Sequence, residues 1–398
     1  MAEPTVSIIV PTFNRARYLP ECLESLLAQT LPPSEIVVVN DGSTDDTAQV
    51  IRPYLDRITY VEKENGGKST ALNLVMPGIQ SDYVWIFDDD DVALPYALET
   101  HLRALEGRPE AGFSYSTYCE GIVGADGRLT KGPLYPLPAV DRDDLFPRLL
   151  EGCFIAQPAT VVRSRCYREV GPFDTRLVRS QDYEMLLRLS RRFPAIRVDE
   201  PSFVLRTHSG LRGSSVNRFT SEHRPSEWFI YAQMVFRELH DELALCEYLP
   251  GGRKNEPLDK AKTRSALFQR MSLMARKGLW EIAARDLKLL VQEEYLAEPL
   301  TISERQACRK AMGNCLAIQE MPSEQAFLPA VRHLRQKGQA AQMRYEFARG
   351  LYYHVIREVR KGNYSLSATI LTTLVSILGF VGTVNATRFK LNFPSQVE

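Results

Sequence analysis

Between residues 6 and 87, short apolar runs alternate with segments in which apolar residues recur at helical spacing. The apolar runs are rich in Val and Ile and end in polar turns, which is typical of buried parallel strands. They are residues 6–10, 35–40, 58–62 and 83–87. Residues 18–29 and 68–75 carry the helical pattern. Because alternating strands and helices form right-handed β-α-β units, the sequence predicts an α/β domain with a mainly parallel sheet.

Polar loops follow three of the predicted strands, at residues 11–17, 41–46 and 88–91. In a parallel α/β sheet, ligands bind where loops leave the carboxyl ends of the strands. We therefore expect the polar side chains of these loops to line one ligand site. In the first loop, the candidates are Pro11, Thr12, Asn14 and Arg15.

Four consecutive aspartates, residues 88–91, come directly after the apolar run at residues 83–87. Adjacent carboxylates repel each other, and their burial without partners is unfavourable. A divalent cation such as Mg²⁺ or Mn²⁺ relieves the repulsion, because it prefers oxygen ligands and keeps coordination positions for phosphate groups. A solvated acidic turn is the alternative, and the location at a strand end favours the metal-linked site.

Two glycine-containing loops are candidates for nucleotide binding. Asp41 can accept hydrogen bonds from a nucleoside, and Gly42 allows positive φ; an Asx turn that caps the next helix is the alternative. Asn65, two glycines and Lys68 resemble half of a phosphate-binding P-loop, but Glu62 stands where that pattern needs glycine, which rejects a P-loop NTPase. We expect Lys68 and the loop NH groups to lie near a pyrophosphate at a helix N-terminus, with a structural turn as the alternative.

After about residue 225 the pattern becomes helical, which predicts a first domain at residues 1–225 and a helical region at residues 226–398. Predicted helices there include residues 279–294 and 303–319. Similar apolar patterns follow Lys277-Gly278 and Lys361-Gly362 and point to a helical repeat, although no fixed period is sustained.

Residues 366–386 contain no charged side chain and are long enough to cross a bilayer. Apolar residues such as Leu366, Ile370, Leu374 and Ile377 recur at helical spacing, however, and polar residues lie opposite them. This amphipathic pattern is typical of a helix buried on one side. A packed helix is therefore the first interpretation, and a helix inserted in or lying on a membrane is the alternative.

The net charge of zero is the sum of two unequal parts. Residues 1–249 hold 26 Lys and Arg against 36 Asp and Glu, net −10, and residues 250–398 hold 23 against 13, net +10. A chain with this total does not present a wholly basic surface to nucleic acid. The basic part predicts attachment to an anionic membrane face or to an acidic protein partner, with a solvated helical surface as the alternative.

The cysteine pattern and the N-terminus indicate the cellular compartment in which the protein is expected. Seven cysteines without a C-x-x-C pair argue against a disulfide framework and a structural zinc site. The first residues lack the basic start and longer apolar stretch of a signal peptide. We therefore expect a cytoplasmic protein, with peripheral attachment to the inner face of the cell membrane through the basic region as an additional expectation.

Seven motifs occur in order across residues 5–215. They are SIIVPTFNRARYL, VVVNDGSTDDT, NGGKSTALN, FDDDDVALP, a G-x-F-D turn at residues 171–174, an E-D-x-x-x-x-x-R helix at residues 181–188 and R-x-H at residues 206–208. These motifs resemble those of family-2 glycosyltransferases. The resemblance implies a GT-A fold, a nucleotide-diphosphate sugar donor, a divalent cation (Mn²⁺ or Mg²⁺) and inversion at the anomeric carbon.

Matching by position implies roles for individual residues. By resemblance, Asp182 is the catalytic base, Asp41 holds the base of the nucleotide, and Asp88 lies near the donor ribose with Asp89 beside it. One departure is that Gln181 stands where the family often has an acidic residue, so this neighbour cannot raise the pKa of Asp182 by charge repulsion.

The resemblance also implies the metal and acceptor contacts. Asp90 is the expected metal ligand, and His208 is the expected contact to the metal or the diphosphate. The region before the G-x-F-D turn faces the acceptor in this family, which makes Gln157 and Thr160 the acceptor-binding candidates. A core strand is the alternative reading of that region.

The expected reaction is metal-assisted transfer of a sugar, with UDP as the expected nucleotide, to a hydroxyl of a glycan or lipid-linked acceptor in cell-surface polysaccharide or glycolipid biosynthesis. One carboxylate suffices as general base, because the leaving diphosphate needs electrostatic stabilisation and no proton. The alternatives are a catalytically inactive nucleotide-sugar-binding or scaffold protein, a nucleotidyltransferase, and a helical region that serves only as a partner-binding module.

Overall fold

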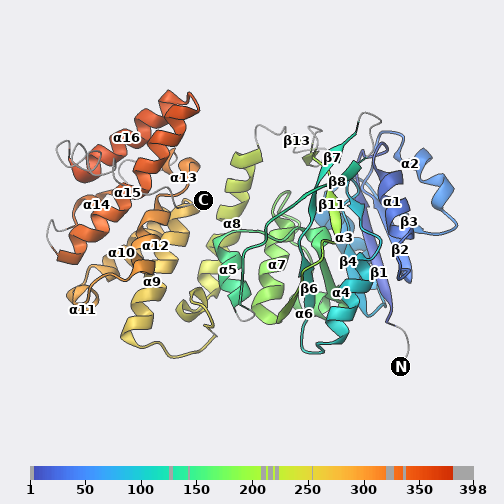
Figure 1. Ribbon diagram of the computed structural model, residues 1–398, viewed down its shortest axis with the longest axis horizontal. Helices are drawn as coiled ribbons and strands as arrows, with labels where there is room; N and C mark the ends of the chain where they lie inside the picture. The colour runs from blue at the N-terminus through green and yellow to red at the C-terminus, as the bar shows by residue number, and fades with distance from the viewer. Residues whose placement is uncertain are drawn as a thin grey trace. The chain divides into compact units, whose positions relative to one another are not determined.

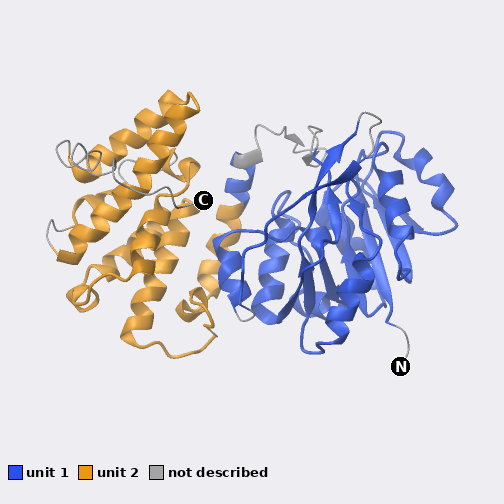
Figure 2. Cartoon of the chain, viewed as in Figure 1, with its two compact units in different colours: residues 1–231 blue, residues 232–398 orange. Residues whose placement is uncertain are grey.

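The computed structural model describes residues 4–124, 129–141, 144–207, 212–213, 218–219, 224–252, 254–319, 327–334 and 338–379. The chain divides into two compact units, residues 1–231 and residues 232–398 (Figure 2). The division falls within helix α8, which runs from Arg224 to Glu242.

A seven-stranded sheet forms the centre of the first unit (Figure 1). β9 is antiparallel to both of its neighbours, and the other paired strands of this sheet are parallel. In spatial order the strands are β10 (Ala195–Val198), β6 (Phe113–Ser116), β9 (Thr160–Arg163), β4 (Tyr83–Ile86), β1 (Val6–Thr12), β2 (Glu35–Asn40) and β3 (Thr59–Glu62). The apolar runs predicted from the sequence therefore form β1 to β4, and the predicted mainly parallel sheet is confirmed.

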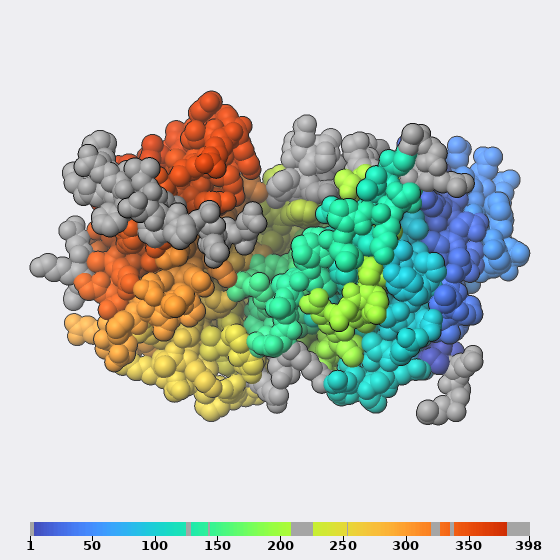
Figure 3. Space-filling model, viewed as in Figure 1, coloured from blue at the N-terminus to red at the C-terminus, as the bar shows by residue number. Residues whose placement is uncertain are grey.

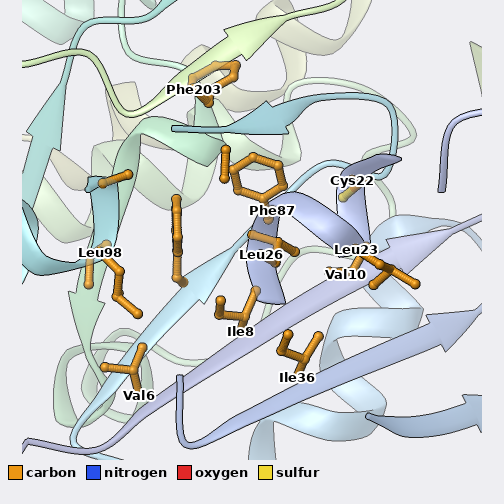
Figure 4. Packing of buried hydrophobic residues seen from close by; sticks show 14 of the residues in the cluster. Val6, Ile8, Val10, Cys22, Leu23, Leu26, Ile36, Phe87, Leu98 and Phe203 are labelled. Carbon is orange, nitrogen blue, oxygen red and sulfur yellow. The ribbon is translucent and has the colours of Figure 1, made fainter. Parts of the chain in front are cut away.

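The core of this unit lies between β1 and the elements packed on it. α1 (Leu19–Leu27) turns Leu19, Cys22, Leu23 and Leu26 inward, the spacing of one helical face. Figure 4 shows side chains from β1, β2 and α1 in one hydrophobic cluster with Phe87 and Phe203. The two aromatic rings form an edge-to-face pair with centroids 6.1 Å apart. Because Phe87 immediately precedes the four aspartates, this packing fixes the point at which they begin.

Smaller elements complete the first unit. α3 packs on β1 and β2, and α4 packs on β6 and β10. A second, four-stranded sheet has the order β5 (Val92–Ala93), β11 (Phe203–Leu205), β7 (Cys119–Val123), β8 (Leu129–Leu134), and β12 (Arg212–Gly213) pairs with β13 (Arg218–Phe219). The remaining helices are α2 (Thr47–Val50), α3 (Lys68–Val75), α4 (Ala97–Glu106), α5 (Leu145–Glu151), α6 (Ser164–Val170) and α7 (Gln181–Arg192), with the 3-10 turns η1 (Arg52–Tyr54), η2 (Met76–Gly78) and η4 (Gln157–Ala159).

The described part of the second unit is helical. α9, α12 and α15 pack in one row, α10, α14 and α16 pack in another, and the two rows contact each other (Figure 1). Two rows of this kind are typical of helical repeat proteins. The elements are η5 (Leu245–Tyr248), α9 (Lys260–Arg276), α10 (Trp280–Leu290), α11 (Glu293–Leu296), α12 (Ile302–Ala311), α13 (Cys315–Gln319), α14 (Phe327–Arg332), α15 (Gly338–Arg360) and α16 (Tyr364–Leu378).

The two glycines singled out in the sequence end helices in the same way. Gly278 after α9 has φ 73° and Gly362 after α15 has φ 76°, a left-handed conformation that favours glycine. The next NH in each case, of Leu279 or Asn363, donates back to a carbonyl of the helix at 2.8 Å or 2.9 Å. The similar sequence patterns therefore correspond to similar turns between antiparallel helices.

α16 occupies the start of the uncharged segment at residues 366–386. It packs on α13, α14 and α15 and buries Leu366, Ile370, Leu374 and Ile377, as the packed-helix interpretation expects. The last helices, drawn in red, also form part of the surface in Figure 3. Across the described residues, no helix combines the length and the apolar composition needed to cross a membrane.

The predicted fold class, an α/β domain followed by a helical region, is confirmed for the described residues. Two segments that were each predicted as one continuous helix form two helices instead. Residues 303–319 form α12 and α13, and Gly313 lies between the two helices. Asn314 Oδ1 accepts the NH of Leu316 at 3.1 Å, which starts the second helix. Residues 279–294 likewise divide into α10 and α11.

Candidate active site

Loops from the carboxyl ends of the central strands form the candidate site. β1 pairs with β2 up to Thr12 and Asn40, and β4 pairs on the other side of β1. Pro11 and Thr12, two of the predicted donor-binding residues, are buried at the end of β1. The acidic loop (residues 88–91) follows β4 and Phe87, so the three predicted loops emerge at the same edge of the sheet.

Asn14 and Arg15 connect the first loop to its neighbours. Asn14 has φ 54°, and its side-chain oxygen accepts the NH groups of Thr44 at 2.7 Å and Asp45 at 3.3 Å. The guanidinium Nε of Arg15 lies 3.8 Å from Oδ2 of Asp90. Asn14 therefore joins the first two loops, whereas Arg15 turns toward the acidic loop.

Asp41 binds the glycine loop that follows β3. Its carboxylate accepts the NH groups of Gly66 at 3.0 Å and Gly67 at 2.7 Å, the Asn65 side-chain amide at 3.1 Å, and the Lys63 ammonium at 2.5 Å. Asp41 is 3% exposed. A carboxylate has about four acceptor positions, so this one is fully used within the protein.

Gly42 lets these two loops come together. Its φ is 72°, and a Cβ at this position would lie 2.7 Å from the Asn65 nitrogen and 3.2 Å from the Lys63 carbonyl oxygen. Both the backbone conformation and the close approach therefore require glycine.

Lys68, the first residue of α3, lies among three of the predicted site carboxylates. It forms a hydrogen-bonded ion pair with Asp88. Burial alone would lower the pKa of Lys68, but the charges of Asp88, Asp182 and Asp89 raise it above its ordinary value. Lys68 thus remains a cation at the N-terminus of a helix, where anions are also favoured by the helix dipole.

The other aspartates of the acidic loop have different surroundings. Asp91 Oδ1 accepts the NH of Arg206 at 2.8 Å, and Asp90 faces Arg15 as described. Burial and the neighbouring charge of Asp90 raise the pKa of Asp89 to about 7, although the charge of Arg15 opposes the shift. Asp91 therefore has a structural partner, while Asp89 and Asp90 form a crowded acidic pair.

Arg206 follows β11 and was missed as a site residue in the sequence, where the R-x-H motif drew attention to its histidine. It is 3% exposed. Its Nε donates to the carbonyl oxygen of Asp90 at 2.9 Å, its Nη2 bonds Glu21, and its guanidinium lies 4.8 Å from the centre of the Tyr18 ring. Lys63, the partner of Asp41, was also missed, because no motif includes it. His208 lies outside the described residues.

The residues present fit a divalent cation bound together with a diphosphate. The described residues include no cluster of three or more His, Cys, Asp or Glu side chains able to hold a metal ion. Mg²⁺ and Mn²⁺ sites in phosphate chemistry, however, use one or two carboxylates plus substrate oxygens. The raised pKa of Asp89 beside Asp90 is the mark of a pair that a cation would stabilise in its ionised form.

Asp182 occupies the first turn of α7. Ser180, just before the helix, has φ 63°, and the Asp182 carboxylate accepts the NH of Tyr183 at 2.9 Å. The charge of Asp182 raises the pKa of Lys68, as do the charges of Asp88 and Asp89 in the acidic loop. Asp182 and the acidic loop therefore act on the same lysine. The side-chain oxygen of Gln181, the departure from the family pattern, is buried without a hydrogen-bond partner.

Two residues hold the G-x-F-D turn between α3 and α7. The Asn73 side chain, on α3, accepts the NH of Phe173 and donates to its carbonyl, both at 2.8 Å. On α7, Arg188 pairs with Glu184 and donates to the carbonyl of Val170 at 2.7 Å. The turn therefore couples the helix that begins with Lys68 to the helix that carries Asp182.

Gln157 and Thr160 lie where β9 begins. Because β9 is antiparallel to β4, its first residues are near the carboxyl end of β4, and the Trp85 indole NH on β4 donates to Pro158 at 2.8 Å. Both predicted residues are buried, and Thr160 donates to the Gln157 carbonyl at 2.8 Å. The side-chain oxygen of Gln157 is buried without a partner.

The family model for glycosyl transferase family 2 matches residues 7–166, which include these loops and the start of α6. Residues 7–166 are therefore similar to glycosyltransferase family 2. The matched residues include the first four motifs on which the resemblance depends. The match ends before α7, so the assignment of Asp182 rests on the motif and on its proximity to Lys68.

Similar sequences and similar solved structures are also known. The chain is 33% identical over 200 residues to an uncharacterized glycosyltransferase of Rickettsia prowazekii, covering 47% of this chain and 59% of that protein. It is 30% identical over 190 residues to the chondroitin synthase of Pasteurella multocida, covering 47% of this chain and 19% of that protein. The structure is similar to S. aureus TarS 1–349 in complex with UDP-GlcNAc, with a TM-score of 0.48, 17% identity, and coverage of 90% of this chain and 92% of that one. The chain thus spans about three fifths or less of these curated relatives.

Proposed function

We propose that the N-terminal unit transfers a sugar from a UDP-sugar to an acceptor hydroxyl with inversion at the anomeric carbon. The observation that carries the proposal is the location of Lys68 among Asp88, Asp89 and Asp182, whose charges raise its pKa. In this arrangement Lys68 can stabilise an anionic leaving group, and Asp182 can serve as a general base. The relationship to chondroitin synthase supports a role in building a cell-surface polysaccharide or glycolipid.

The donor is bound, in this proposal, by the loops after β1, β2 and β3. The Asp41 carboxylate holds the NH groups of Gly66 and Gly67, so its first effect is to shape the loop that leads into α3. The N-terminus of α3 and the Lys68 ammonium then face the donor diphosphate, because a helix N-terminus and a partly buried cation both favour an anion. Asn14, Arg15 and Asn65 complete this side of the site.

A divalent cation, Mn²⁺ or Mg²⁺, would be held by Asp90 and Asp89 together with the diphosphate, with His208 as a further proposed contact. When bound, it would act as a Lewis acid and stabilise the charge that develops on the leaving diphosphate. Lys68 supplies a second positive charge to the same oxygens. Electrostatic stabilisation of this kind needs no proton donor at the leaving group.

Asp182 is the proposed general base. The acceptor hydroxyl loses its proton during attack, and one carboxylate within hydrogen-bond reach can receive it. Gln181, the residue before Asp182, is neutral. Gln157, whose buried side-chain oxygen has no partner in the protein, and Thr160 are the proposed acceptor contacts.

Turnover tests this proposal directly. Purified protein is incubated with a panel of nucleotide sugars, with Mn²⁺, with Mg²⁺ and with EDTA, and released nucleoside diphosphate is measured with and without glycan acceptors. We expect a UDP-sugar to give metal-dependent release that an acceptor increases. Nucleotide-sugar binding without any transfer or hydrolysis would instead support the inactive binding protein, and pyrophosphate release from a nucleoside triphosphate would support a nucleotidyltransferase.

The helical unit is proposed to attach the enzyme to an acidic partner or an anionic membrane face in the cytoplasm. Residues 232–398 contain 24 Lys and Arg against 17 Asp and Glu, a net charge of +7. Each basic residue near an anionic bilayer contributes about 1 kcal/mol at the surface. The full chain should co-sediment with vesicles that contain phosphatidylserine and be released by high salt, whereas absence of binding at low salt would contradict the membrane proposal.

A further inference from the structure

Arg206 contacts the acidic loop twice, once through its main chain and once through its side chain. Its main-chain NH donates to the Asp91 carboxylate at 2.8 Å, and its side-chain Nε donates to the main-chain carbonyl of Asp90 at 2.9 Å. One residue at the end of β11 therefore binds two consecutive residues of the loop. These bonds involve the Asp91 carboxylate and the Asp90 backbone, and none of them uses the carboxylate of Asp89 or Asp90.

The far end of the guanidinium is anchored to α1. Nη2 bonds the Glu21 carboxylate, and the group lies 4.8 Å from the Tyr18 ring centre, within the range of a cation–π contact. The Arg206 side chain is 3% exposed. Because α1 is packed into the hydrophobic core, the acidic loop is connected through Arg206 to a rigid helix as well as to its own strand.

The chemistry of arginine suits this arrangement. A guanidinium is planar and carries several NH donors in fixed directions, so it can bind a carbonyl on one side and a carboxylate on another at once. A lysine ammonium on a flexible stem has no such geometry. A buried positive charge beside four consecutive aspartates also offsets part of their mutual repulsion.

We propose that Arg206 is a positioning residue that holds the acidic loop in the conformation in which Asp89 and Asp90 bind a divalent cation together with UDP. The inference rests on the proposed function for the identity of the ligands. It assigns to Arg206 no contact with the cation or the donor. Outer-shell residues of this kind typically change metal affinity about 10- to 100-fold when they are replaced.

The test is a Mn²⁺ titration of the full chain in the presence of UDP, in which free Mn²⁺ is followed by electron paramagnetic resonance. Arg206→Lys keeps the charge but removes the two-directional geometry, and we expect Mn²⁺ affinity to fall about 10- to 100-fold. Circular dichroism and the urea midpoint report in parallel whether the fold is kept.

Arg163 provides a matched control on the opposite edge of the sheet. This partly buried arginine donates to the carbonyls of Ala111 and Leu105, both at 2.8 Å, and to the Tyr83 hydroxyl at 2.9 Å. Arg163→Lys therefore removes a comparable set of bonds far from the acidic loop. It should lower the urea midpoint and leave the Mn²⁺ affinity unchanged.

A second variant covers the case in which Arg206→Lys does not fold. Glu21 is 36% exposed in its side chain, so Glu21→Gln should fold while it weakens the anchor of Arg206. A several-fold loss of Mn²⁺ affinity in this variant supports the inference. Wild-type affinity in Glu21→Gln, or in a folded Arg206→Lys, overturns it. A wild-type protein that binds neither Mn²⁺ nor UDP overturns the proposed function itself, which is a different result.

Discussion

Lys68 and Asp88 form an ion pair that joins the N-terminus of α3 to the end of β4. Lys68 begins α3 and Asp88 follows β4, and both side chains are partly exposed, by 23% and 34% respectively. We expect a bound diphosphate to replace Asp88 as the main partner of Lys68, because it carries more negative charge. The free enzyme would thus keep the lysine in place for the leaving group.

Replacing Lys68 by Met should weaken UDP binding and lower kcat/KM by about two to three orders of magnitude, the effect of losing one electrostatic contact to a developing charge. Lys131→Met is the control, since Lys131 lies exposed on β8. UDP titration calorimetry and steady-state kinetics measure the two effects. An unchanged UDP affinity in Lys68→Met would show that the lysine serves only the ion pair with Asp88.

Asp182→Asn should lower kcat by about 10²- to 10⁴-fold and leave UDP-sugar affinity unchanged, because the variant keeps the shape of the side chain but cannot accept the proton. Glu184→Gln, a neutralisation on the same helix, serves as the control and should affect the contact with Arg188 more than turnover. Transfer at the wild-type rate in Asp182→Asn would remove the assignment of this residue as the base.

Asp41→Asn should reduce both stability and UDP affinity. The carboxylate accepts four donors in a nearly closed environment, so the change leaves NH groups and Lys63 without a full partner, at a cost of about 2–4 kcal/mol. Asp82→Asn is the control, because Asp82 is exposed and lies at the opposite end of β4. Urea unfolding measures stability. A loss of UDP affinity with no loss of stability would mean that Asp41 contacts the nucleotide instead of shaping the loop.

Local sequence patterns predicted the bounds of the strands and of α3 to within a few residues. The helix predicted at residues 68–75 is α3, because Gly67 with φ 90° precedes it and the 3-10 turn at Met76–Gly78 follows it. The strand predicted at residues 6–10 continues to Thr12 as β1, since pairing with β2 extends past Pro11. Such ends depend on the neighbouring strand, which the periodicity of a single segment does not contain.

The partners of the site residues could not be predicted in the same way. The sequence placed Asp41 and the acidic loop at strand ends, but Arg206 is 115 positions from Asp91 along the chain. Likewise, nothing in the motif around Asn65 indicates that its loop folds back onto Asp41. These contacts follow from the way the strands are ordered in the sheet. The chemistry of each side chain could therefore be predicted from the sequence. Whether a side chain binds a ligand or supports its neighbours could be judged only from the folded structure.

Acid should destabilise the N-terminal unit through His101. Burial lowers the pKa of this histidine from 6.5 to about 3, so below pH 6.5 the unfolded chain takes up a proton that the native state does not. Its contribution to stability is therefore full above pH 6.5 and is lost as the pH falls toward 3. Between pH 7 and pH 5 the loss is about 2 kcal/mol.

Urea unfolding of wild type and His101→Gln at both pH values isolates this contribution. The variant should lose less stability on acidification, since glutamine does not titrate but can still bond Ser114, the present partner of His101 at 2.8 Å. His354 in the helical unit, whose pKa burial lowers to about 4, titrates in both proteins and cancels in the comparison. Equal acid sensitivity in the two proteins would contradict the prediction.

Glu304→Ala should destabilise the helical unit by about 3–5 kcal/mol, because it leaves Arg264 buried without its carboxylate. The pair joins α12 to α9 at 2.9 Å, with side-chain exposures of 3% and 8%, and Glu304 also accepts the NH of Thr301 at 2.8 Å as part of a helix cap. The double replacement Arg264→Met with Glu304→Leu should be milder, since no unpaired charge remains.

The exposed pair Arg103–Glu99 on α4 is the matched control, with side-chain exposures of 73% and 42%. Glu99→Ala should cost less than about 1 kcal/mol, as exposed pairs do. Differential scanning calorimetry can follow the transition of the helical unit in each variant. If Glu304→Ala and Glu99→Ala were equally mild, the contact between α9 and α12 would depend on their apolar surfaces and not on the buried ion pair.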